Sequence, residues 1–411
     1  MHFAAELINY ILLFIALYFE VFLLITYFET RKIERGFGLL PLSEKLPSVT
    51  IFVPCWNEEK TICKTIISLL KLDYPKHLLS IFIINDGSTD NTLKVIQKFA
   101  RNKQIQIFSK ENGGKHTALN YGLSLAKSDL VGCLDADSFV HPQALKRLVV
   151  KFQDKEMMAV TPSIKVHEPK NIIELIQKSE YLLGAFIRKI FARLNALYVT
   201  PGPFTIFRKS VFEQLGYYKH AHNTEDMEIA MRMQKNRLKI GNVHDAFIYT
   251  VAPKNLRGLL KQRLRWSYGF IKNAIDYRQI FFRPQYGHLG VMILPIAGFS
   301  LFTSVYFALQ RISGWILNGW VRFVEWHTVG LSWPNFNFDF FYFNTSIVSF
   351  ISVIAIVGFI SIIIISRHLT QEKHKIGFDS IYFLVFYSFI APIWIAKALY
   401  KAAFAKTTTW R

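Results

Sequence analysis

The stretch DLVGCLDADSFV, residues 129–140, is an apolar run that ends in two carboxylates one residue apart. Asp135 and Asp137 repel each other, so their spacing needs an explanation. Asp is common in turns, because its side chain accepts hydrogen bonds from neighbouring backbone N–H groups. Two carboxylates just past a strand also suit Mg²⁺ or Mn²⁺, which keep other coordination sites for water and phosphate. The pair alone does not decide between a turn and a cation site.

The flanking sequence alternates apolar runs with amphipathic segments. Asn57 is predicted to open the first helix, with Glu58 and Glu59 in its first turn. This alternation predicts an α/β fold with a mostly parallel sheet and helices on both faces. Ligands bind such sheets beyond the carboxyl ends of the strands, where the acids lie. The predicted strands are 49–55, 78–86, 104–109 and 130–135, and the helices are 57–72, 91–100 and 115–127.

Two further segments of this region carry polar residues at strand ends. Asp86 ends the second predicted strand, and a strand-to-helix turn explains the residues after it but not Asp86 itself. Gly113 and Gly114 stand directly before Lys115, which opens a helix. Paired glycines before a helix can cradle phosphate, although the pattern matches no standard phosphate loop.

Two later segments hold acids, bases and an indole. Thr224 is predicted to cap a helix that opens with Glu225 and Asp226, and complementing the helix dipole explains only one of these acids. The run KQRLRW then begins at residue 261. Its basic residues fit an amphipathic helix on the bilayer surface. Gln262 and Trp266 share one face of this helix, but a surface helix requires neither residue.

Composition indicates a membrane protein with a basic cytoplasmic face. The 411 residues carry a formal net charge of +20, are 51% hydrophobic and include 37 Phe. The Lys and Arg excess lies beside apolar windows, which argues against a nucleic-acid binder. The three cysteines form no metal or disulfide pattern. Membrane helices are predicted at about 7–28, 286–309, 347–365 and 376–396, and an interfacial segment at 311–338.

Basic residues beside these windows predict the orientation. Arg31, Lys32 and Arg35 place the N-terminus outside and the next polar region in the cytoplasm. The loop 366–375 then falls inside, in agreement, but the basic tail falls outside. Either the last window is re-entrant or the helix count is off by one. The predicted parts are an N-terminal anchor at 1–35, a cytoplasmic domain at 49–253, an amphipathic interface segment at 254–285 and a transmembrane region at 286–411.

Taken together, the motifs resemble those of a known family. They occur in the order D, DxD, TED and QxxRW, at Asp86, Asp135 to Asp137, Thr224 to Asp226, and Gln262 to Trp266. This order resembles the membrane-embedded family 2 glycosyltransferases: cellulose, chitin and hyaluronan synthases and bacterial poly-N-acetylglucosamine synthases. The resemblance covers residues 49–277, and the layout is most similar to the poly-N-acetylglucosamine and chitin-oligomer synthases. It implies a GT-A fold and an inverting transfer from a UDP-sugar.

The resemblance also implies a role for each residue. The implied nucleotide-sugar site is Asp86, Lys115, Asp135, Gln262 and Arg265. Asp137, with Asp135, would bind Mg²⁺ or Mn²⁺. Asp226 would be the general base beside Glu225, and Trp266 would stack under the acceptor sugar. An inverting displacement needs one base opposite the leaving group, and a leaving diphosphate needs cations.

The implied product is a β-linked polysaccharide, with N-acetylglucosamine as the expected sugar, made at the plasma (inner) membrane. Ceramide glucosyltransferases and related enzymes share the D, DxD and QxxRW motifs but add one sugar to a lipid, so a glycolipid acceptor stays open. A non-catalytic scaffold would have lost the base or the metal acids, which are all present. The loop TPGPFTIFRK, residues 200–209, has prolines beside Gly202 where many relatives have small residues, which leaves the acceptor open. Sugar, linkage, chain length and oligomeric state are not fixed by the sequence.

Overall fold

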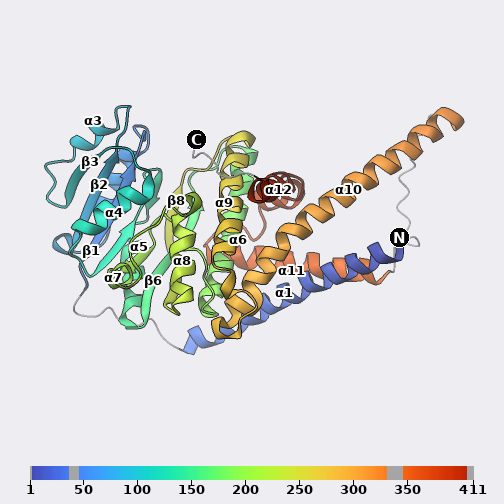
Figure 1. Ribbon diagram of the computed structural model, residues 1–411, viewed down its shortest axis with the longest axis horizontal. Coiled ribbons are helices and arrows are strands. Elements are labelled where there is room, and N and C mark those ends of the chain that lie inside the picture. The colour runs from blue at the N-terminus through green and yellow to red at the C-terminus, as the bar shows by residue number, and fades with distance from the viewer. Residues whose placement is uncertain (1, 37–45, 331–345, 405–411) are drawn as a thin grey trace.

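The α/β domain is built on one eight-stranded sheet (Figure 1). The computed structural model describes residues 2–36, 46–330 and 346–404. Within these residues the strand order is β3-β2-β1-β4-β7-β6-β8-β5. The strands are β1 (Val49–Cys55), β2 (Leu79–Asp86), β3 (Ile105–Lys110), β4 (Leu130–Cys133), β5 (Ser138–Val140), β6 (Met157–Val166), β7 (Ile206–Arg208) and β8 (Lys239–Thr250).

The sheet is mixed, which refines the expectation of a mostly parallel one. β1 pairs in parallel with β2 and β4, β2 with β3, and β6 with β8. The short strand β7 runs antiparallel between β4 and β6, and β5 runs antiparallel to β8. The four strands predicted from the alternating pattern are therefore parallel, as expected. The antiparallel pairings all involve a strand of three residues, which is too short to show a period of two.

Helices cover both faces of the sheet because alternate residues of each strand point to opposite sides. Ile51 and Val53 of β1 join the core on one face, under α2 (Ile62–Leu70) and α5 (Ala144–Val150). Phe52 joins the core on the other face, with residues of α4 (Lys115–Leu125) and α8 (Glu225–Lys235). Two shorter helices complete the domain, α3 (Thr92–Gln97) and α7 (Ser210–Leu215).

The predicted start of the first helix is wrong. Helix α2 begins at Ile62, and Asn57 lies in the preceding loop with a left-handed φ of 56°. Instead of capping the helix, the Asn57 Oδ1 atom accepts a hydrogen bond of 2.8 Å from the backbone N of Thr89. This bond joins the loops after β1 and β2, and it leaves Glu58 outside the helix, at the carboxyl edge of the sheet.

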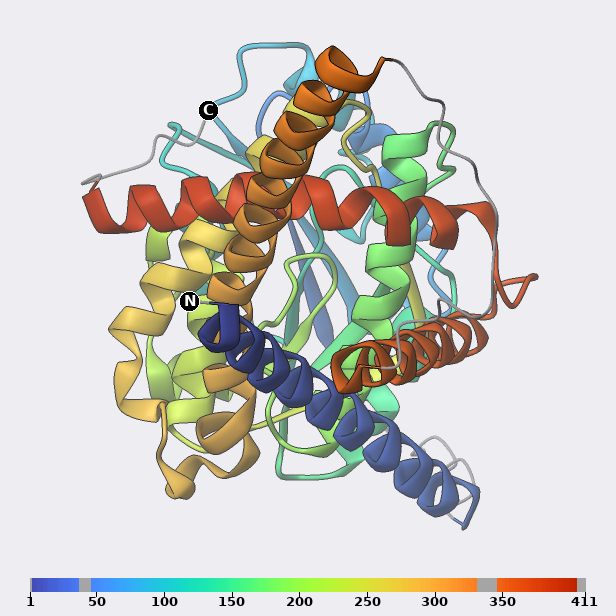
Figure 2. The same cartoon turned by 90° about the vertical axis from the view of Figure 1, so that its right-hand side faces the viewer.

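Three long helices stack beside the sheet. Helix α6 (Ile172–Arg193) begins with a capping box between Asn171 and Glu174, and α9 (Leu256–Asp276) begins at Asn255. Helix α12 (Phe378–Phe404) crosses both of them (Figure 2). A buried ion pair of 2.6 Å between Arg367 and Asp379 lies at the start of α12, and Asp379 also accepts a hydrogen bond from Ser179 of α6. The apolar C-terminal region is thereby joined to the α/β domain.

Within the described ranges, four helices are long and apolar enough to cross a membrane, as predicted. They are α1 (His2–Gly36), α10 (Leu294–Val329) with the π-helical turn before it, α11 (Ile347–Leu369) and α12. Helix α1 packs along α11 (Figure 1). The segment predicted as interfacial, from residue 311, is helical up to Val329 as a continuation of α10, and residues 331–338 lie outside the described residues. Arg322 and Glu325 do not interrupt the helix, because both side chains are exposed and neither charge is buried.

Candidate active site

The predicted site residues line one cavity of about 530 Å³. It lies between the carboxyl edge of the sheet, the start of α8, and the helices α6 and α9. All nine residues named from the sequence contribute to its lining: Asp86, Lys115, Asp135, Asp137, Glu225, Asp226, Gln262, Arg265 and Trp266. The fold therefore brings together four motifs that span 181 positions of the chain, from residue 86 to residue 266.

Asp86 holds the glycine pair in place. Its carboxylate accepts hydrogen bonds from the backbone N of Gly113 (3.1 Å) and of Gly114 (2.9 Å), and it forms an ion pair of 2.7 Å with Lys110. Gly114 has a φ of +88°, a conformation that glycine adopts without strain. Asp86 thus fixes the loop before α4 and also lines the cavity.

Lys115 is the counter-ion of two acids. Its Nζ atom lies 2.7 Å from Asp135 Oδ1 and 3.0 Å from Glu225 Oε1. Burial alone would lower the pKa of Lys115, but these carboxylates raise it well above its usual value. A Cβ atom at Gly202 would lie 2.6 Å from this Nζ atom, so a larger residue there would push the lysine away from its two acids. This contact accounts for the glycine between two prolines.

Asp137 has the features of a cation ligand. Burial, with the neighbouring carboxylates of Asp135 and Glu58, raises its pKa to about 7. A divalent cation would remove this repulsion. Within the described residues, no group of three His, Cys, Asp or Glu side chains is placed to enclose a metal. One or two carboxylates, completed by water and substrate phosphates, are how Mg²⁺ is usually held, so the donor set fits Mg²⁺ or Mn²⁺.

Glu225 and Asp226 lie side by side at the start of α8 but titrate differently. Burial, and then the charge of Glu225, raise the pKa of Asp226 to about 6. Burial would also raise the pKa of Glu225, but Lys115 outweighs it and the pKa lies below its usual value. Environments that push the pKa values of two neighbouring acids apart are typical of a catalytic pair, in which one is the proton acceptor.

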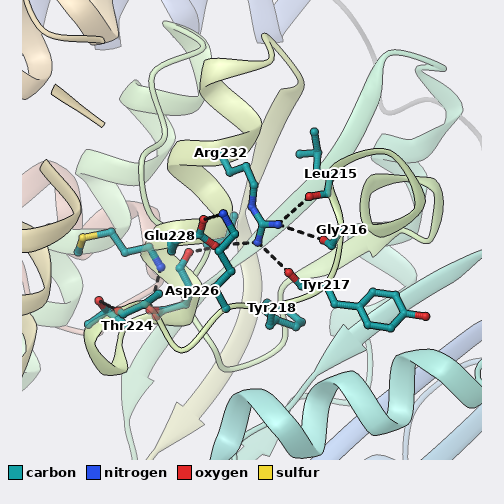
Figure 3. A network of polar contacts seen from close by, with 12 residues as sticks. Leu215, Gly216, Tyr217, Tyr218, Thr224, Asp226, Glu228 and Arg232 are labelled. Carbon is teal, nitrogen blue, oxygen red and sulfur yellow. Dashed lines mark hydrogen bonds and ion pairs between the residues drawn. The ribbon is translucent and has the colours of Figure 1, made fainter. Parts of the chain in front are cut away.

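A buried arginine of helix α8, Arg232, ties the helix to the segment that precedes it (Figure 3). The Arg232 guanidinium donates hydrogen bonds of 2.7–3.2 Å to the carbonyls of residues 215–217. It also pairs with Glu228 at 2.7 Å, and Glu228 accepts a further bond of 2.6 Å from the Tyr277 hydroxyl. These bonds hold α8, and with it Asp226, against the neighbouring segments.

The predicted capping role of Thr224 is wrong. Thr224 is the residue before α8, but its hydroxyl makes no bond to the first turn. Instead it donates to the Ala221 carbonyl at 3.0 Å and accepts from Asn273 Nδ2 at 2.9 Å. A Cβ atom at Gly269 would clash with this side chain, so α9 packs directly on the threonine. Thr224 therefore joins the TED segment to the helix that carries Gln262, Arg265 and Trp266.

Helix α9 forms the opposite side of the cavity. Arg265 Nη1 donates to the Asn223 carbonyl at 2.9 Å. Arg263 lies 4.2 Å from the centroid of the Trp266 ring and pairs with Glu180 of α6 at 2.6 Å. Arg263 is only 3% exposed, so a basic helix lying on the bilayer is the wrong interpretation for this residue. One face of the indole is covered by the guanidinium, and the residue also lines the cavity.

Among the lining residues that the sequence did not indicate, four carry a titratable side chain close to the predicted ones: Glu58, Glu180, Tyr181 and Arg188. Glu58 could have been found, because it follows β1 at the same sheet edge as Asp86 and Asp135. The other three lie on α6, whose sequence reads as an ordinary amphipathic helix. No motif among them indicates that this helix faces a cavity.

Sequence comparison agrees with the geometry. The model of the family described as Glycosyltransferase like family 2 matches residues 47–269. A poly-beta-1,6-N-acetyl-D-glucosamine synthase of Staphylococcus epidermidis is 28% identical over 381 residues, covering 91% of this chain and 87% of that protein. The enzyme of the same name from Staphylococcus aureus (strain COL) is 34% identical over 262 residues, covering 62% of this chain and 63% of that protein.

The fold has a counterpart among solved structures. A mannosyltransferase from Pyrobaculum calidifontis, solved with GDP-Man and Mn²⁺, superimposes with a TM-score of 0.59 and covers 97% of this chain and 99% of that one, at 18% identity. The predicted GT-A fold, with apolar helices at both ends, is thereby confirmed. Fold and cavity define a glycosyltransferase. The chain belongs to glycosyltransferase family 2, as its motifs predicted.

Proposed function

We propose that this enzyme transfers N-acetylglucosamine from UDP-N-acetylglucosamine to the growing end of a β-linked polysaccharide, with inversion at the anomeric carbon. The observation that carries the proposal is the arrangement of Asp226 beside the Lys115-bound Glu225, in one cavity with Asp137 and Trp266. The staphylococcal relatives that are named poly-beta-1,6-N-acetyl-D-glucosamine synthases support the choice of sugar and product.

Asp226 is the general base of this reaction. Its carboxylate takes the proton from the acceptor hydroxyl as the hydroxyl oxygen attacks the anomeric carbon, on the face opposite UDP. The bond to UDP breaks and UDP leaves with the electron pair. A pKa of about 6 leaves Asp226 ionised at neutral pH yet more basic than an ordinary Asp, as a general base requires. Glu225 stays ionised beside Lys115 and raises that basicity.

The nucleotide is held at the sheet edge. Asp86 and the loop that it fixes would contact the nucleoside. Asp137 and Asp135 would hold Mg²⁺ or Mn²⁺, which supplies charge stabilisation to the leaving diphosphate when bound. Gln262 and Arg265 would bind the same diphosphate from α9.

The acceptor then lies against the uncovered face of Trp266. An indole face suits the C–H face of a pyranose and leaves the sugar hydroxyls free. Arg263 and Glu180 fix the ring from behind through their contacts of 4.2 Å and 2.6 Å. The acceptor hydroxyl can then project toward Asp226, because both residues line the same cavity.

We place the catalytic domain, residues 49–253, and the segment 254–285 in the cytoplasm, at the plasma (inner) membrane. Support comes from the basic residues that follow the first apolar window and from the four apolar helices. UDP-sugars are then available on the side where the cavity opens, and the product must cross the membrane.

The decisive experiment offers purified membranes a panel of radiolabelled UDP-sugars and measures UDP release and product size. We expect release with UDP-N-acetylglucosamine and a ladder of polymer lengths, both abolished by Asp226→Asn. A single organic-soluble labelled glycolipid would instead establish transfer of one sugar to a lipid. Release with a different UDP-sugar only would overturn the choice of N-acetylglucosamine.

A further inference from the structure

Arg188 lines the cavity from α6, and the reaction described above makes no use of it. Its Nε and Nη2 atoms are buried, and neither has a hydrogen-bond partner among the described residues. These two nitrogens share one edge of the planar guanidinium, so their N–H groups point in the same direction. A buried edge of this kind is costly unless an acceptor oxygen occupies it.

None of the described residues provides such an oxygen. Glu180, the acid on the same helix that also lines the cavity, is engaged by Arg263 at 2.6 Å and by the Tyr387 hydroxyl at 3.2 Å. Burial lowers the pKa of Arg188 to about 10, and only Tyr181 opposes that effect. No described carboxylate lies within ion-pair distance of this guanidinium, in contrast to Lys115 across the cavity.

The backbone beneath Arg188 makes room for it. A Cβ atom at Gly184, one turn earlier, would lie 3.1 Å from Arg188 Nη1 and 3.7 Å from Cζ. The guanidinium therefore lies flat along the glycine, and a larger residue at 184 would displace it. Tyr181, Gly184 and Arg188 recur every three or four residues and form one stripe on the face of α6 that lines the cavity.

This stripe belongs to the acceptor side. Arg263 lies over both Trp266 (4.2 Å) and Tyr181 (5.9 Å), so the stripe continues the surface of the indole proposed to carry the acceptor. The acids proposed to hold the metal lie on the sheet edge instead, and Arg265, proposed to bind the diphosphate, contacts the Asn223 carbonyl near the start of α8. A ligand oxygen that reaches Arg188 is therefore expected to come from the acceptor.

We propose that Arg188 recognises the acetamido carbonyl oxygen of an acceptor sugar and excludes acceptors that carry a free amine there. The inference rests on the proposed function. In a polymerase each transferred sugar becomes part of the next acceptor. A hydrogen-bond donor that is fixed beside the acceptor must therefore meet an acceptor atom on the sugar that was transferred. A carbonyl oxygen has two lone pairs for the two N–H groups, whereas a glucosammonium would place a cation against a cation.

The test compares two soluble acceptor oligosaccharides, fully N-acetylated and N-deacetylated, with UDP-N-acetylglucosamine and detergent-purified enzyme. For wild type we expect transfer to the acetylated acceptor to be favoured. Arg188→Met should raise the KM for the acetylated acceptor about tenfold or more, because a hydrogen bond to a charged donor is lost. The KM for UDP-N-acetylglucosamine should stay within about twofold, since the diphosphate is bound elsewhere.

Two further variants separate recognition from packing. Arg188→Gln, which keeps N–H donors but no charge, should retain part of the acetylated activity and accept the deacetylated acceptor better than wild type does. Arg193→Met, an exposed arginine on the same helix, should change neither value.

Equal changes for both acceptors in Arg188→Met, or a matching rise in the KM for the UDP-sugar, would overturn the inference while the proposed function stands. Absence of any transfer from UDP-N-acetylglucosamine by wild type would overturn the proposed function, and the inference with it.

Discussion

The two sides of the cavity hold their charges in different ways. At the sheet edge and the start of α8, Lys115 pairs with Asp135 and Glu225, while the pKa values of Asp137 and Asp226 are raised. On the helical side, Glu180 and Arg263 form a direct pair that also supports Trp266. The sheet edge and the start of α8 therefore carry excess negative charge, which suits them to bind a cation and to accept a proton. On the helical side Glu180 is neutralised by Arg263, and Arg188 keeps a guanidinium edge free of described partners for a neutral sugar oxygen.

Removal of the base should have the largest effect on the acidic side. Asp226→Asn cannot accept the acceptor proton, and loss of a general base typically lowers turnover 10²–10⁴-fold. UDP binding should persist, because the amide leaves Lys115 and Glu225 in place. Turnover and UDP affinity are measured in parallel with Asp245→Asn, whose side chain pairs with Arg147 outside the cavity, as control. Turnover within threefold of wild type would exclude Asp226 as the base.

Breaking the pair on the helical side should instead reduce stability. Arg263→Met leaves Glu180 without its partner, and removal of one member of a buried pair costs roughly 3–5 kcal/mol. We expect a loss near the lower end of this range, because the Glu180 side chain is 22% exposed and solvent can partly hydrate the unpaired charge. Denaturant unfolding of the detergent-purified enzyme measures the loss.

The matched controls for this pair are the exposed Arg257→Met on the same helix and the double variant Glu180→Leu with Arg263→Met. The first should behave like wild type. The second should regain most of the stability, because an apolar pair of similar volume leaves no buried charge unpaired. A double variant as unstable as the single one would show that Arg263 acts by packing alone.

The same contrast explains what the sequence could predict. Asp86, Asp135 and Asp137 follow apolar strands, and parallel strands end at one edge, so their meeting was predictable. Glu180 and Arg188 sit on a helix whose cavity-facing side is defined only by contacts with distant elements. For the same reason the interpretation of Arg263 as a surface base was wrong. Local sequence does not contain the pairing of α6 with α9.

A smaller effect is expected on the metal dependence of UDP binding, which should involve the acidic side of the cavity only. Asp137→Ala should weaken UDP binding about 100-fold in the presence of Mg²⁺ or Mn²⁺, since a bound cation contributes several kcal/mol to a phosphate complex. Without metal, the variant and wild type should bind UDP almost equally. Calorimetric titration with and without EDTA measures both, and Asp73→Ala, which removes an exposed acid, serves as control. Full wild-type activity in EDTA would exclude a cation site and show that residues 135–137 only form a turn.

The pH profile should follow the acidic side alone. The pKa of Asp226 is raised to about 6, so the proton-free base is fully present well above pH 6 and is lost as pH falls. At saturating metal, turnover should be half-maximal near pH 6 and fall about tenfold per unit below it. Turnover is measured from pH 5 to 8, with circular dichroism to confirm that the fold persists. An acid limb centred near 4 would mean that an unperturbed carboxylate is the base.

The smallest effect is expected outside the cavity, at Glu20 of α1. Its carboxyl group faces α11 rather than lipid, because a Cβ atom at Gly358 would lie 2.9 Å from Glu20 Cδ. The Oε1 atom is buried with no hydrogen-bond partner among the described residues. An acid at this depth costs a few kcal/mol unless protein or water surrounds it. Two interpretations follow: Glu20 serves packing between α1 and α11, or it accepts hydrogen bonds from a sugar chain that passes between these helices.

Glu20→Leu separates the two in sealed vesicles, where polymer synthesis and export are measured independently. If Glu20 lines a sugar path, the variant still binds UDP, but its polymer is shorter or its export slower, by severalfold rather than by the orders of magnitude expected for Asp226→Asn. Glu29→Leu removes an exposed acid from the same helix and should leave length and export unchanged. Since leucine fills the same space without an acceptor oxygen, normal polymer length and normal export in Glu20→Leu would assign the residue to packing alone.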